Sequence, residues 1–501
     1  MRVVFVALVV IIWFVAASAA GALADWRPAD IRPTTQTLAA VLAANRAATG
    51  TPSAAFARRR EQWTYRVAGR ELPVSVAVRD DDYRATTEVG TAHYDAGRLH
   101  GVRWRADANG IVHGLLADQQ GDAIDRLPQS RFPLARDAVS LAGETRDAWV
   151  IAYRPSGDPP SWLYVDKTSG LIRSERTREG RRVHSIAFDG FAGVDGIELP
   201  RHWRVSDGDP RHDVDVAVTS VLAAPVDAAS VAIPTIERVF APPAGAPDPL
   251  PLVARFNRGE ISLEAVVDGR RRWMILDTGT ASITLNGSGA GRFNPLLEHA
   301  VVPRMSVGPL ALDDVSVLVI GGAGDGVPDI LGYDFFFGHV VHVDYRREKV
   351  DVYSDAAAAP IFADAATVVI PANVDQGLPL VHVSFGAIGS DAFAIDTGSP
   401  KLYALDPFAR RFAREIAARW TPAGRPYIES YLEGSISVVP YEVAGFTFGA
   451  HDFGKTIVGV SNSNGDSQML DIPFDGIIGT DILRNFDLYF DFDHSRIGIR
   501  R

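Results

Sequence analysis

The chain has 501 residues, of which 47% are hydrophobic and 22% charged, so it is long enough for two or three domains with buried cores. Its formal net charge of −11 argues against nucleic-acid binding. Cysteine is absent, which excludes disulfides, zinc–thiolate sites and thiol nucleophiles.

Residues 1–24 have the pattern of a signal peptide. Arg2 precedes an apolar run from Val3 to Val15, and Ala22-Leu23-Ala24 fits a cleavage site before Asp25. An uncleaved membrane anchor is the alternative, because the apolar character continues to Ala24 and is long enough to span a bilayer. The sequence predicts export to a periplasm or beyond, with no membrane span after cleavage.

Residues 25–245 are predicted to form an N-terminal β-rich domain. A helix capped by Thr35 and ending at Gly50 comes first. Short alternating segments such as Trp63–Val67 and Trp162–Val165 follow, separated by polar turns, which is typical of an antiparallel sheet with one wet face. The stretch from Tyr164 to Ile172 resembles the curved sheets of lipoprotein-carrier-like domains, and a generic β accessory domain is the alternative.

A proline-rich stretch, Ala241 to Pro249, marks a boundary between two parts of the chain. Its proline density is typical of a semi-rigid linker. The sequence beyond it contains a tandem repeat, for which we expect one domain over 246–360 and another over 361–501.

The repeat is defined by two motifs that recur in the same order. An apolar run ends on Asp277-Thr278-Gly279-Thr280 in the first copy and on Asp396-Thr397-Gly398-Ser399 in the second. Each is followed by an apolar pair and a glycine, at Ile330-Leu331-Gly332 and Ile477-Ile478-Gly479. The spacing between the aspartates gives a repeat of about 120 residues.

These motifs resemble those of the aspartic peptidases of the pepsin and retropepsin type. The resemblance covers residues 252–501 and implies a mainly β protein with two barrel-like lobes, one aspartate from each lobe meeting at the centre. Asp277 and Asp396 match the catalytic positions. Lobes that pair between two chains, rather than within one chain, are an alternative.

The chemistry of such a pair needs no cofactor. Two carboxylates about 3 Å apart cannot both ionise, so they share one proton. The ionised carboxylate can then accept a proton from water while the protonated one donates to a carbonyl oxygen.

The resemblance also implies supporting roles for the rest of both motifs. The threonines would hydrogen-bond across the centre, the glycines would let the backbone approach closely, and the terminal hydroxyls would donate to the carboxylates. The residues concerned are Thr278, Gly279, Thr280, Thr397, Gly398, Ser399, Gly332 and Gly479.

The two copies differ between their motifs. In the second, Asp406 and Pro407 begin a predicted helix, and Pro426 to Pro440 predicts a hairpin with its tip near Gly434, a candidate flap. In the first copy a glycine-rich stretch, 286–291, replaces the helix, and no flap hairpin is predicted.

Other candidate sites are explained better by turns and strands. The stretch Gly321–Gly326 lacks the Lys-Ser/Thr of a phosphate loop. His339 and His342 are expected on opposite faces of a strand, and the acidic residues at 487, 491 and 493 lack EF-hand spacing. No metal site is predicted.

The sequence thus predicts an exported aspartic endopeptidase, a monomeric hydrolase that cleaves polypeptide substrates through Asp277 and Asp396. The alternative is a catalytically silent periplasmic binding or scaffold protein. It would retain the aspartic protease fold and bind lipid or protein through its N-terminal domain.

Overall fold

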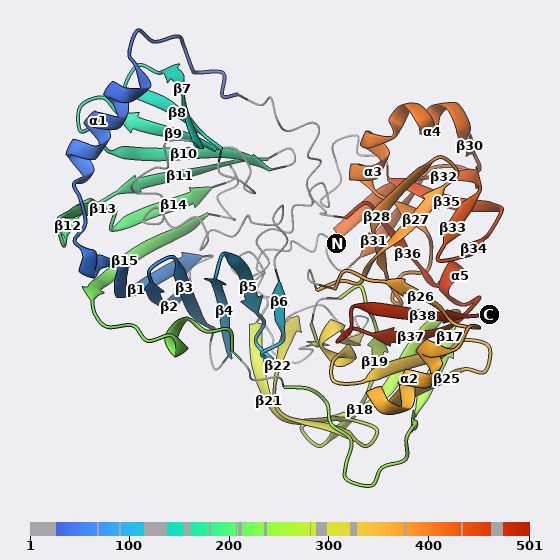
Figure 1. Ribbon diagram of the computed structural model, residues 1–501. Coiled ribbons are helices and arrows are strands. Elements are labelled where there is room, and N and C mark those ends of the chain that lie inside the picture. The colour runs from blue at the N-terminus through green and yellow to red at the C-terminus, as the bar shows by residue number, and fades with distance from the viewer. Residues whose placement is uncertain are drawn as a thin grey trace. The chain divides into compact units, whose positions relative to one another are not determined.

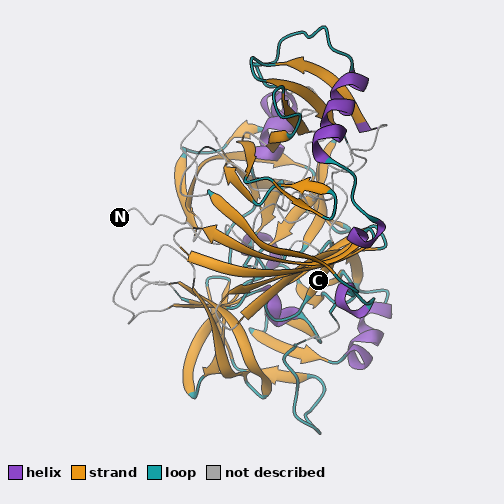
Figure 2. Cartoon of the chain, turned by 90° about the vertical axis from the view of Figure 1, so that its left-hand side faces the viewer, coloured by secondary structure: helices purple, strands orange, loops and turns teal. Residues whose placement is uncertain are grey.

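The computed structural model describes residues 27–67, 70–89, 92–114, 138–154, 161–179, 182–206, 208, 213–234, 238–280, 282–286, 298–320, 328–374, 377–431, 434–461 and 474–501. Strands dominate and helices are short, so the predicted mainly β class is confirmed (Figure 2). The chain divides into two compact units. The N-terminal unit extends to Thr235, apart from Asn109–His113, and the C-terminal unit joins Asn109–His113 to Ile236–Arg501.

The N-terminal unit is built on one large antiparallel sheet. Within the described residues its thirteen strands follow the order β6-β5-β4-β3-β2-β1-β15-β14-β11-β10-β9-β8-β7 (Figure 1). The strands are β1 (Arg58–Val67), β2 (Arg70–Arg79), β3 (Asp82–Val89), β4 (Ala92–Leu99), β5 (Val102–Ala106), β6 (Val112–Gly114), β7 (Val139–Glu144), β8 (Ala148–Tyr153), β9 (Ser161–Asp166), β10 (Ile172–Glu179), β11 (Arg182–Asp189), β14 (His202–Ser206) and β15 (Val214–Ala223). A separate hairpin consists of β12 (Ala192–Val194) and β13 (Ile197–Leu199).

One face of this sheet is a continuous apolar cluster, which we call the inner face. Strand alternation brings every second side chain to it, including Leu163, Ile186 and Val205. Trp63 and Trp203 meet there edge to face, with ring centroids 5.4 Å apart. Val41 of helix α1 (Leu38–Thr49) belongs to the same cluster.

Helix α1 begins two residues later than the sequence predicts. The Thr37 hydroxyl, rather than that of Thr35, accepts a hydrogen bond from Ala40 N at 3.2 Å. The Thr34 hydroxyl accepts from Gln36 N, which holds residues 34–36 in a turn outside the helix. The helix ends at Gly50 as predicted, where φ is 84°.

The described part of the C-terminal unit forms three sheets. Within the described residues, one has six strands in the order β16-β25-β24-β37-β38-β26, and another has seven in the order β17-β18-β19-β23-β20-β22-β21. The third follows β30-β32-β35-β29-β36-β28-β27-β33-β34, with β31 paired to β32.

Its strands are β16 (Leu250–Leu252), β17 (Ala254–Asn257), β18 (Glu260–Val267), β19 (Arg270–Leu276), β20 (Thr284–Asn286), β21 (Glu298–Val307), β22 (Leu310–Ile320), β23 (Asp329–Leu331), β24 (Val340–Asp344), β25 (Lys349–Tyr353), β26 (Val368–Pro371), β27 (Leu380–Phe385), β28 (Ile388–Ile395), β29 (Tyr403–Ala404), β30 (Thr421–Pro422), β31 (Tyr427–Tyr431), β32 (Gly434–Ala444), β33 (Phe446–Phe448), β34 (His451–Asp452), β35 (Lys455–Ser461), β36 (Gly476–Ile478), β37 (Asp487–Asp491) and β38 (Arg496–Arg500).

Strand pairing repeats between the two larger sheets of this unit. The hairpin β18–β19 corresponds to β27–β28, and β19 and β28 each pair in parallel with a short strand, β23 and β36 respectively. In both sheets that short strand pairs antiparallel with another, β20 or β29. The six-stranded sheet joins both halves of the repeat through the antiparallel pair β24–β37.

Short helices complete the C-terminal unit. The helix predicted from Asp406 forms in two pieces, α3 (Asp406–Arg411) and α4 (Ala413–Arg419), which bury Phe408 and Ile416. The predicted hairpin forms from β31 and β32. Among the described residues, the other helices are α2 (Asp355–Ala363), α5 (Thr480–Leu483) and the 3-10 turns η2 (Ala54–Ala57), η5 (Ala229–Val231) and η6 (Tyr333–Phe336), of which η2 and η5 belong to the N-terminal unit.

Candidate functional site

Both aspartates of the repeated motif stand directly after a buried strand. β19 ends at Leu276 and β28 ends at Ile395, so the next residue in each case is Asp277 or Asp396. The parallel neighbouring strand fixes each backbone. Asp277 N donates to Leu331 O at 3.0 Å, and Asp396 N donates to Ile478 O at 3.1 Å.

The two motif threonines are fully buried and interlock the two loops. Thr278 N donates to the Thr397 hydroxyl, and Thr397 N donates to the Thr278 hydroxyl, both at 3.1 Å. The Thr278 hydroxyl donates to Ile395 O at 2.6 Å, and the Thr397 hydroxyl donates to Leu276 O at 2.7 Å. These four reciprocal bonds join the two halves of the repeat at its centre.

Glycine is required in both motifs because the opposite carboxyl group is so close. A Cβ atom at Gly279 would lie 2.4 Å from Cγ of Asp396, and one at Gly398 would lie 2.6 Å from Cγ of Asp277. The glycines of the later element are equally confined. A Cβ at Gly332 would lie 2.3 Å from Ser282 O, and one at Gly479 would lie 2.4 Å from Lys401 O.

Each carboxylate accepts hydrogen bonds from its own loop. Asp277 accepts from Gly279 N and from the Thr280 hydroxyl, both at 2.7 Å. Asp396 accepts from the backbone N–H groups of Gly398 and Ser399, both at 2.9 Å. The Ser399 hydroxyl does not take the expected role, because it lies 3.5 Å from Lys401 O and donates there.

The two carboxyl groups are coupled electrostatically. Burial raises the pKa of Asp396 well above its usual value, and the charge of Asp277 and a hydrogen bond with it raise this pKa further. The N–H groups of Gly398 and Ser399 oppose the rise. The raised pKa favours the protonated form of Asp396, and a protonated carboxyl group can both donate and accept a hydrogen bond.

A second pair of acids, which the sequence did not single out, lies behind these loops: Asp334 is buried and Asp481 is partly buried. Asp334 accepts from Ile283 N at 3.3 Å, and Asp481 accepts from Leu402 N at 3.2 Å. Each lies two residues after the glycine of the later element, so the repeated Gly-Xaa-Asp spacing was a signal that could have identified both.

Asn109 is a further residue that the sequence gave no reason to select. Its side-chain amide donates to Asp334 and to Ser316 O, both at 3.0 Å, and accepts from Ser316 N at 2.8 Å. The residue is 3% exposed. A side chain far away in the sequence thus completes the support behind the first loop.

The candidate flap lies beside the second loop. Nζ of Lys401 is 3.3 Å from the Tyr427 hydroxyl and 3.8 Å from a carboxylate oxygen of Glu429. The Tyr403 hydroxyl donates to Glu429 at 2.8 Å. Lys401 follows the second motif by two residues, so these contacts tie β31 to that loop.

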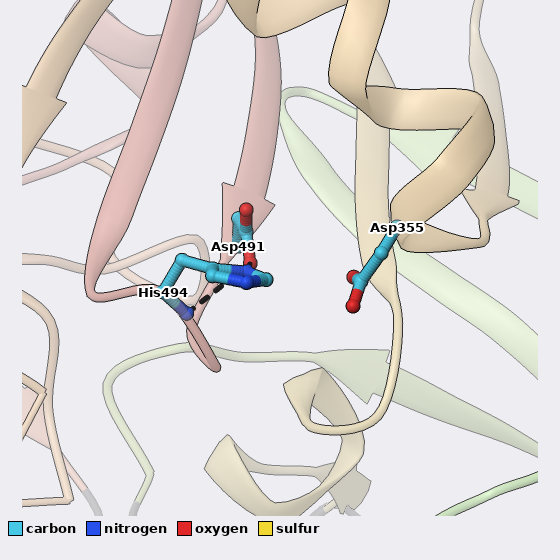
Figure 3. Close-up of side chains that lie close together, drawn as sticks. All are labelled: Asp355, Asp491 and His494. Carbon is cyan, nitrogen blue, oxygen red and sulfur yellow. Dashed lines mark hydrogen bonds and ion pairs between the residues drawn. The ribbon is translucent and has the colours of Figure 1, made fainter.

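One group of side chains has the proximity that a metal site requires. Ligand atoms of Asp355, Asp491 and His494 lie within 4.8 Å of one another (Figure 3). However, the Arg496 guanidinium donates to Asp491 at 2.7 Å, and His494 lies 2.8 Å from its other oxygen. Asp491 is therefore already compensated by protein cations, which argues against a metal here. The stretch 321–326 lies outside the described residues.

Comparison with known proteins gives no family for this chain. No protein-family model matches it, and no curated protein does. A LolA superfamily protein from Nitrosomonas europaea matches with a TM-score of 0.31 and 8% identity, over 40% of this chain and 98% of that one. A putative outer membrane lipoprotein-sorting protein domain from Vibrio parahaemolyticus matches with a TM-score of 0.27 and 8% identity, over 36% and 90%.

An aspartic proteinase from Irpex lacteus matches over 50% of this chain and 96% of that one, with a TM-score of 0.31 and 12% identity. These comparisons correct two predictions. Because no protein-family model and no curated protein matches the chain, the assignment to the aspartic peptidases is withdrawn. The prediction that the protein is a hydrolase, an aspartic endopeptidase, is withdrawn for the same reason.

Within the residues that the structure describes, no helix is long and apolar enough to cross a membrane. The predicted signal peptide, residues 1–24, lies outside the described residues.

Proposed function

We propose that this protein is an exported, catalytically silent binding protein whose N-terminal unit holds an apolar ligand, such as the acyl chains of a lipid or a lipid-modified protein. The observation that carries the proposal is the inner face of the thirteen-stranded sheet. It is a single apolar cluster that runs across the sheet from β3 to β7.

The dimensions of this face suit a chain-like ligand. Thirteen strands spaced about 4.8 Å apart give a width of roughly 60 Å. Helix α1, the one α-helix among the described residues of the unit, has 12 residues and is only about 18 Å long. Described helical structure therefore covers a small part of the apolar surface that the strands present.

For the C-terminal unit, we propose a two-lobed module of the pepsin or retropepsin type, with lobes over 246–360 and 361–501. The repeated strand pairing supports this assignment. Within it, the Asp277–Asp396 pair and the interlocked threonines would act as a hydrogen-bonded clasp between the lobes. The module would then be a scaffold, and the protein a monomer with both lobes in one chain.

The test is to express the full chain with its own N-terminus in a bacterium with two membranes and then fractionate the cells. We expect periplasmic protein that begins at Asp25, with lipid detected by native mass spectrometry. Retention of residues 1–24 on membranes would replace cleavage by anchoring.

A variant pair tests the binding face itself. Trp149 packs against the inner-face cluster, whereas Val183 is 36% exposed and alternates to the outer face. Trp149→Arg should weaken binding of a fluorescent fatty acid by about tenfold, and Val183→Arg should not. Absence of any lipid, together with peptide hydrolysis that Asp277→Asn abolishes, would overturn the proposal.

A further inference from the structure

The helical segment α3–α4 of the C-terminal unit has one apolar side and one basic side. Its apolar side consists of residues spaced by four positions, which belong to the apolar cluster of the unit or pack against it: Phe408, Phe412, Ile416 and Trp420. Arg414 is two positions from Phe412 and from Ile416, so it lies on the opposite side, which is exposed. Helix α4 lies at the periphery of the unit (Figure 1).

Three exposed arginines, Arg414, Arg419 and Arg425, form what we call the arginine surface. Arg419 is in the last turn of α4, and Arg425 follows it by six residues. Six residues span at most about 20 Å, so both arginines belong to the same end of the unit. The loop before Arg425 is held in place, because Ala423 N donates to Pro440 O at 2.8 Å.

The arginine surface is not neutralised by the protein itself. Within the part of the chain that the structure describes, none of its three arginines has a carboxylate partner, whereas the neighbouring Arg410 pairs with Asp406 and Arg411 pairs with Asp475. One acidic residue, Glu415, lies among the arginines on α4. The surface is therefore positive in a chain whose formal net charge is −11, with 61 acidic residues against 50 Lys and Arg.

Stability does not account for this arrangement. Like charges that lack counter-charges repel one another and so weaken the folded state. In a chain with an excess of carboxylates, a group of unpaired arginines is a departure from ordinary surface pairing. Such departures are expected where a protein binds something.

We propose that the arginine surface docks the protein onto a membrane that contains anionic phospholipids. A guanidinium group can form two parallel hydrogen bonds to one phosphate, and basic side chains on an exposed helix face are attracted to anionic head groups. The choice of a membrane over another polyanion rests on the proposed function, because a protein that holds a lipid has to receive it from a membrane or deliver it there.

The negative charge of the whole chain does not oppose this docking. At physiological salt, electrostatic interactions between exposed charges are screened beyond about 8 Å. Only charges close to the head groups therefore contribute, and at the arginine surface these are mainly positive. The same screening predicts that added salt weakens the docking.

Co-sedimentation of the purified full-length protein with lipid vesicles tests the proposal. Vesicles of phosphatidylglycerol and phosphatidylcholine in equal amounts should bind at least about tenfold more tightly than vesicles of phosphatidylcholine alone. The triple variant Arg414→Gln, Arg419→Gln, Arg425→Gln should bind the mixed vesicles at least about tenfold more weakly, because each basic residue near the head groups contributes about fivefold. The corresponding triple lysine variant keeps the charge and should stay within about threefold of the wild type.

The matched control is the triple variant Arg258→Gln, Arg270→Gln, Arg484→Gln, which removes the same charge at three exposed positions of the same unit. It should bind the mixed vesicles within about twofold of the wild type. Equal losses for the two glutamine variants would show that overall charge, rather than the arginine surface, is responsible. Equal binding to both kinds of vesicle, or tighter binding to a single-stranded DNA oligonucleotide than to the mixed vesicles, would also overturn the proposal.

Binding of a fluorescent fatty acid, measured without vesicles, separates this inference from the proposed function. Fatty-acid binding without a preference for anionic vesicles would reject the docking surface and leave the lipid-holding function in place. A preference for anionic vesicles that depends on the three arginines, without fatty-acid binding, would support the docking surface and reject the lipid-holding function.

Discussion

At the scale of single residues, the centre of the C-terminal unit depends on glycines and threonines that no other residue type can replace without loss of a contact. The motif glycines leave room for the opposing carboxyl groups, and the motif threonines have both their backbone N–H groups and their hydroxyls committed across the centre. Little freedom remains at either position, because each group has a partner within the other loop.

We predict that Gly279→Ala destabilises the C-terminal unit by about 1–3 kcal/mol, as overpacking does in a tight core. The added methyl would lie 2.4 Å from Cγ of Asp396, so the Asp277–Asp396 pair must separate. Urea denaturation measures the change. Gly193→Ala is the control, because its methyl would meet only the flexible end of Glu198, at 3.2 Å. Equal losses for both variants would contradict the argument.

The interlocked threonines should behave as one unit. Thr278→Val and Thr397→Val each leave a buried backbone N–H of the other loop without its acceptor, at a cost of about 1–3 kcal/mol. The double variant should cost clearly less than the sum of the two, because either change breaks the same reciprocal contacts. A double-mutant cycle in urea measures this coupling, and strict additivity would argue against it.

His339 gives the protein a predictable pH dependence. Burial lowers the pKa of its imidazole from 6.5 to about 4. Between these values the unfolded chain binds a proton that the folded chain does not, so stability should fall as the pH is lowered from 6.5 to 4 and then level off. The total loss from this group is about 3 kcal/mol.

The measurement compares urea denaturation at pH 4 and pH 7 for the wild type and His339→Gln. The variant should lose less stability on acidification than the wild type does, whereas His382→Gln, an exposed control on β27, should not differ from the wild type.

Asp396 affects the pH dependence of stability in the opposite sense. Its raised pKa stabilises the folded state below its usual value of 3.8, and this contribution is lost as the pH rises through the raised value. The informative quantity is therefore the difference between wild type and His339→Gln in the stability lost from pH 7 to pH 4, because the contribution of Asp396 is common to both.

At the scale of elements, the repeated strands could be predicted from the sequence, whereas the hydrogen bonds that hold their ends and caps could not. The strands β19 and β28, with the parallel strands β23 and β36 beside them, follow from apolar runs that end on Asp-Thr-Gly and from the later Gly element. The first turn of α1 was misplaced by two residues, because several hydroxyl residues in a row could cap it and only the Thr34 turn decides between them. The Ser399 hydroxyl donates to Lys401 O. Local geometry determines this partner, and the sequence pattern does not predict it.

Asn109 illustrates support that comes from a distant segment. Its amide satisfies both backbone groups of Ser316 on β22 and one oxygen of Asp334, which also holds the Ile283 backbone. We predict that Asn109→Ala destabilises the C-terminal unit by about 1–3 kcal/mol, because it leaves buried polar groups without partners. Asn257→Ala, at the exposed end of β17, is the control. Loss of amide-exchange protection near Ser316 in Asn109→Ala alone would locate the effect.

At the scale of the whole molecule, the described residues form two separate large apolar clusters. One belongs to the N-terminal sheet and the other to the three sheets of the C-terminal unit. The alternating patterns predicted both β-rich parts, whereas the order of the thirteen strands depends on pairings between distant segments that no local pattern specifies.

Separate cores predict separate unfolding. Each unit buries its own apolar surface and is large enough to fold cooperatively, so calorimetry of the full chain should show two transitions rather than one. Gly279→Ala should lower the midpoint of one transition only. A fatty acid bound to the inner face should raise the midpoint of the other transition, because a ligand stabilises the unit that holds it. A single transition that both perturbations shift together would show that the two units unfold as one.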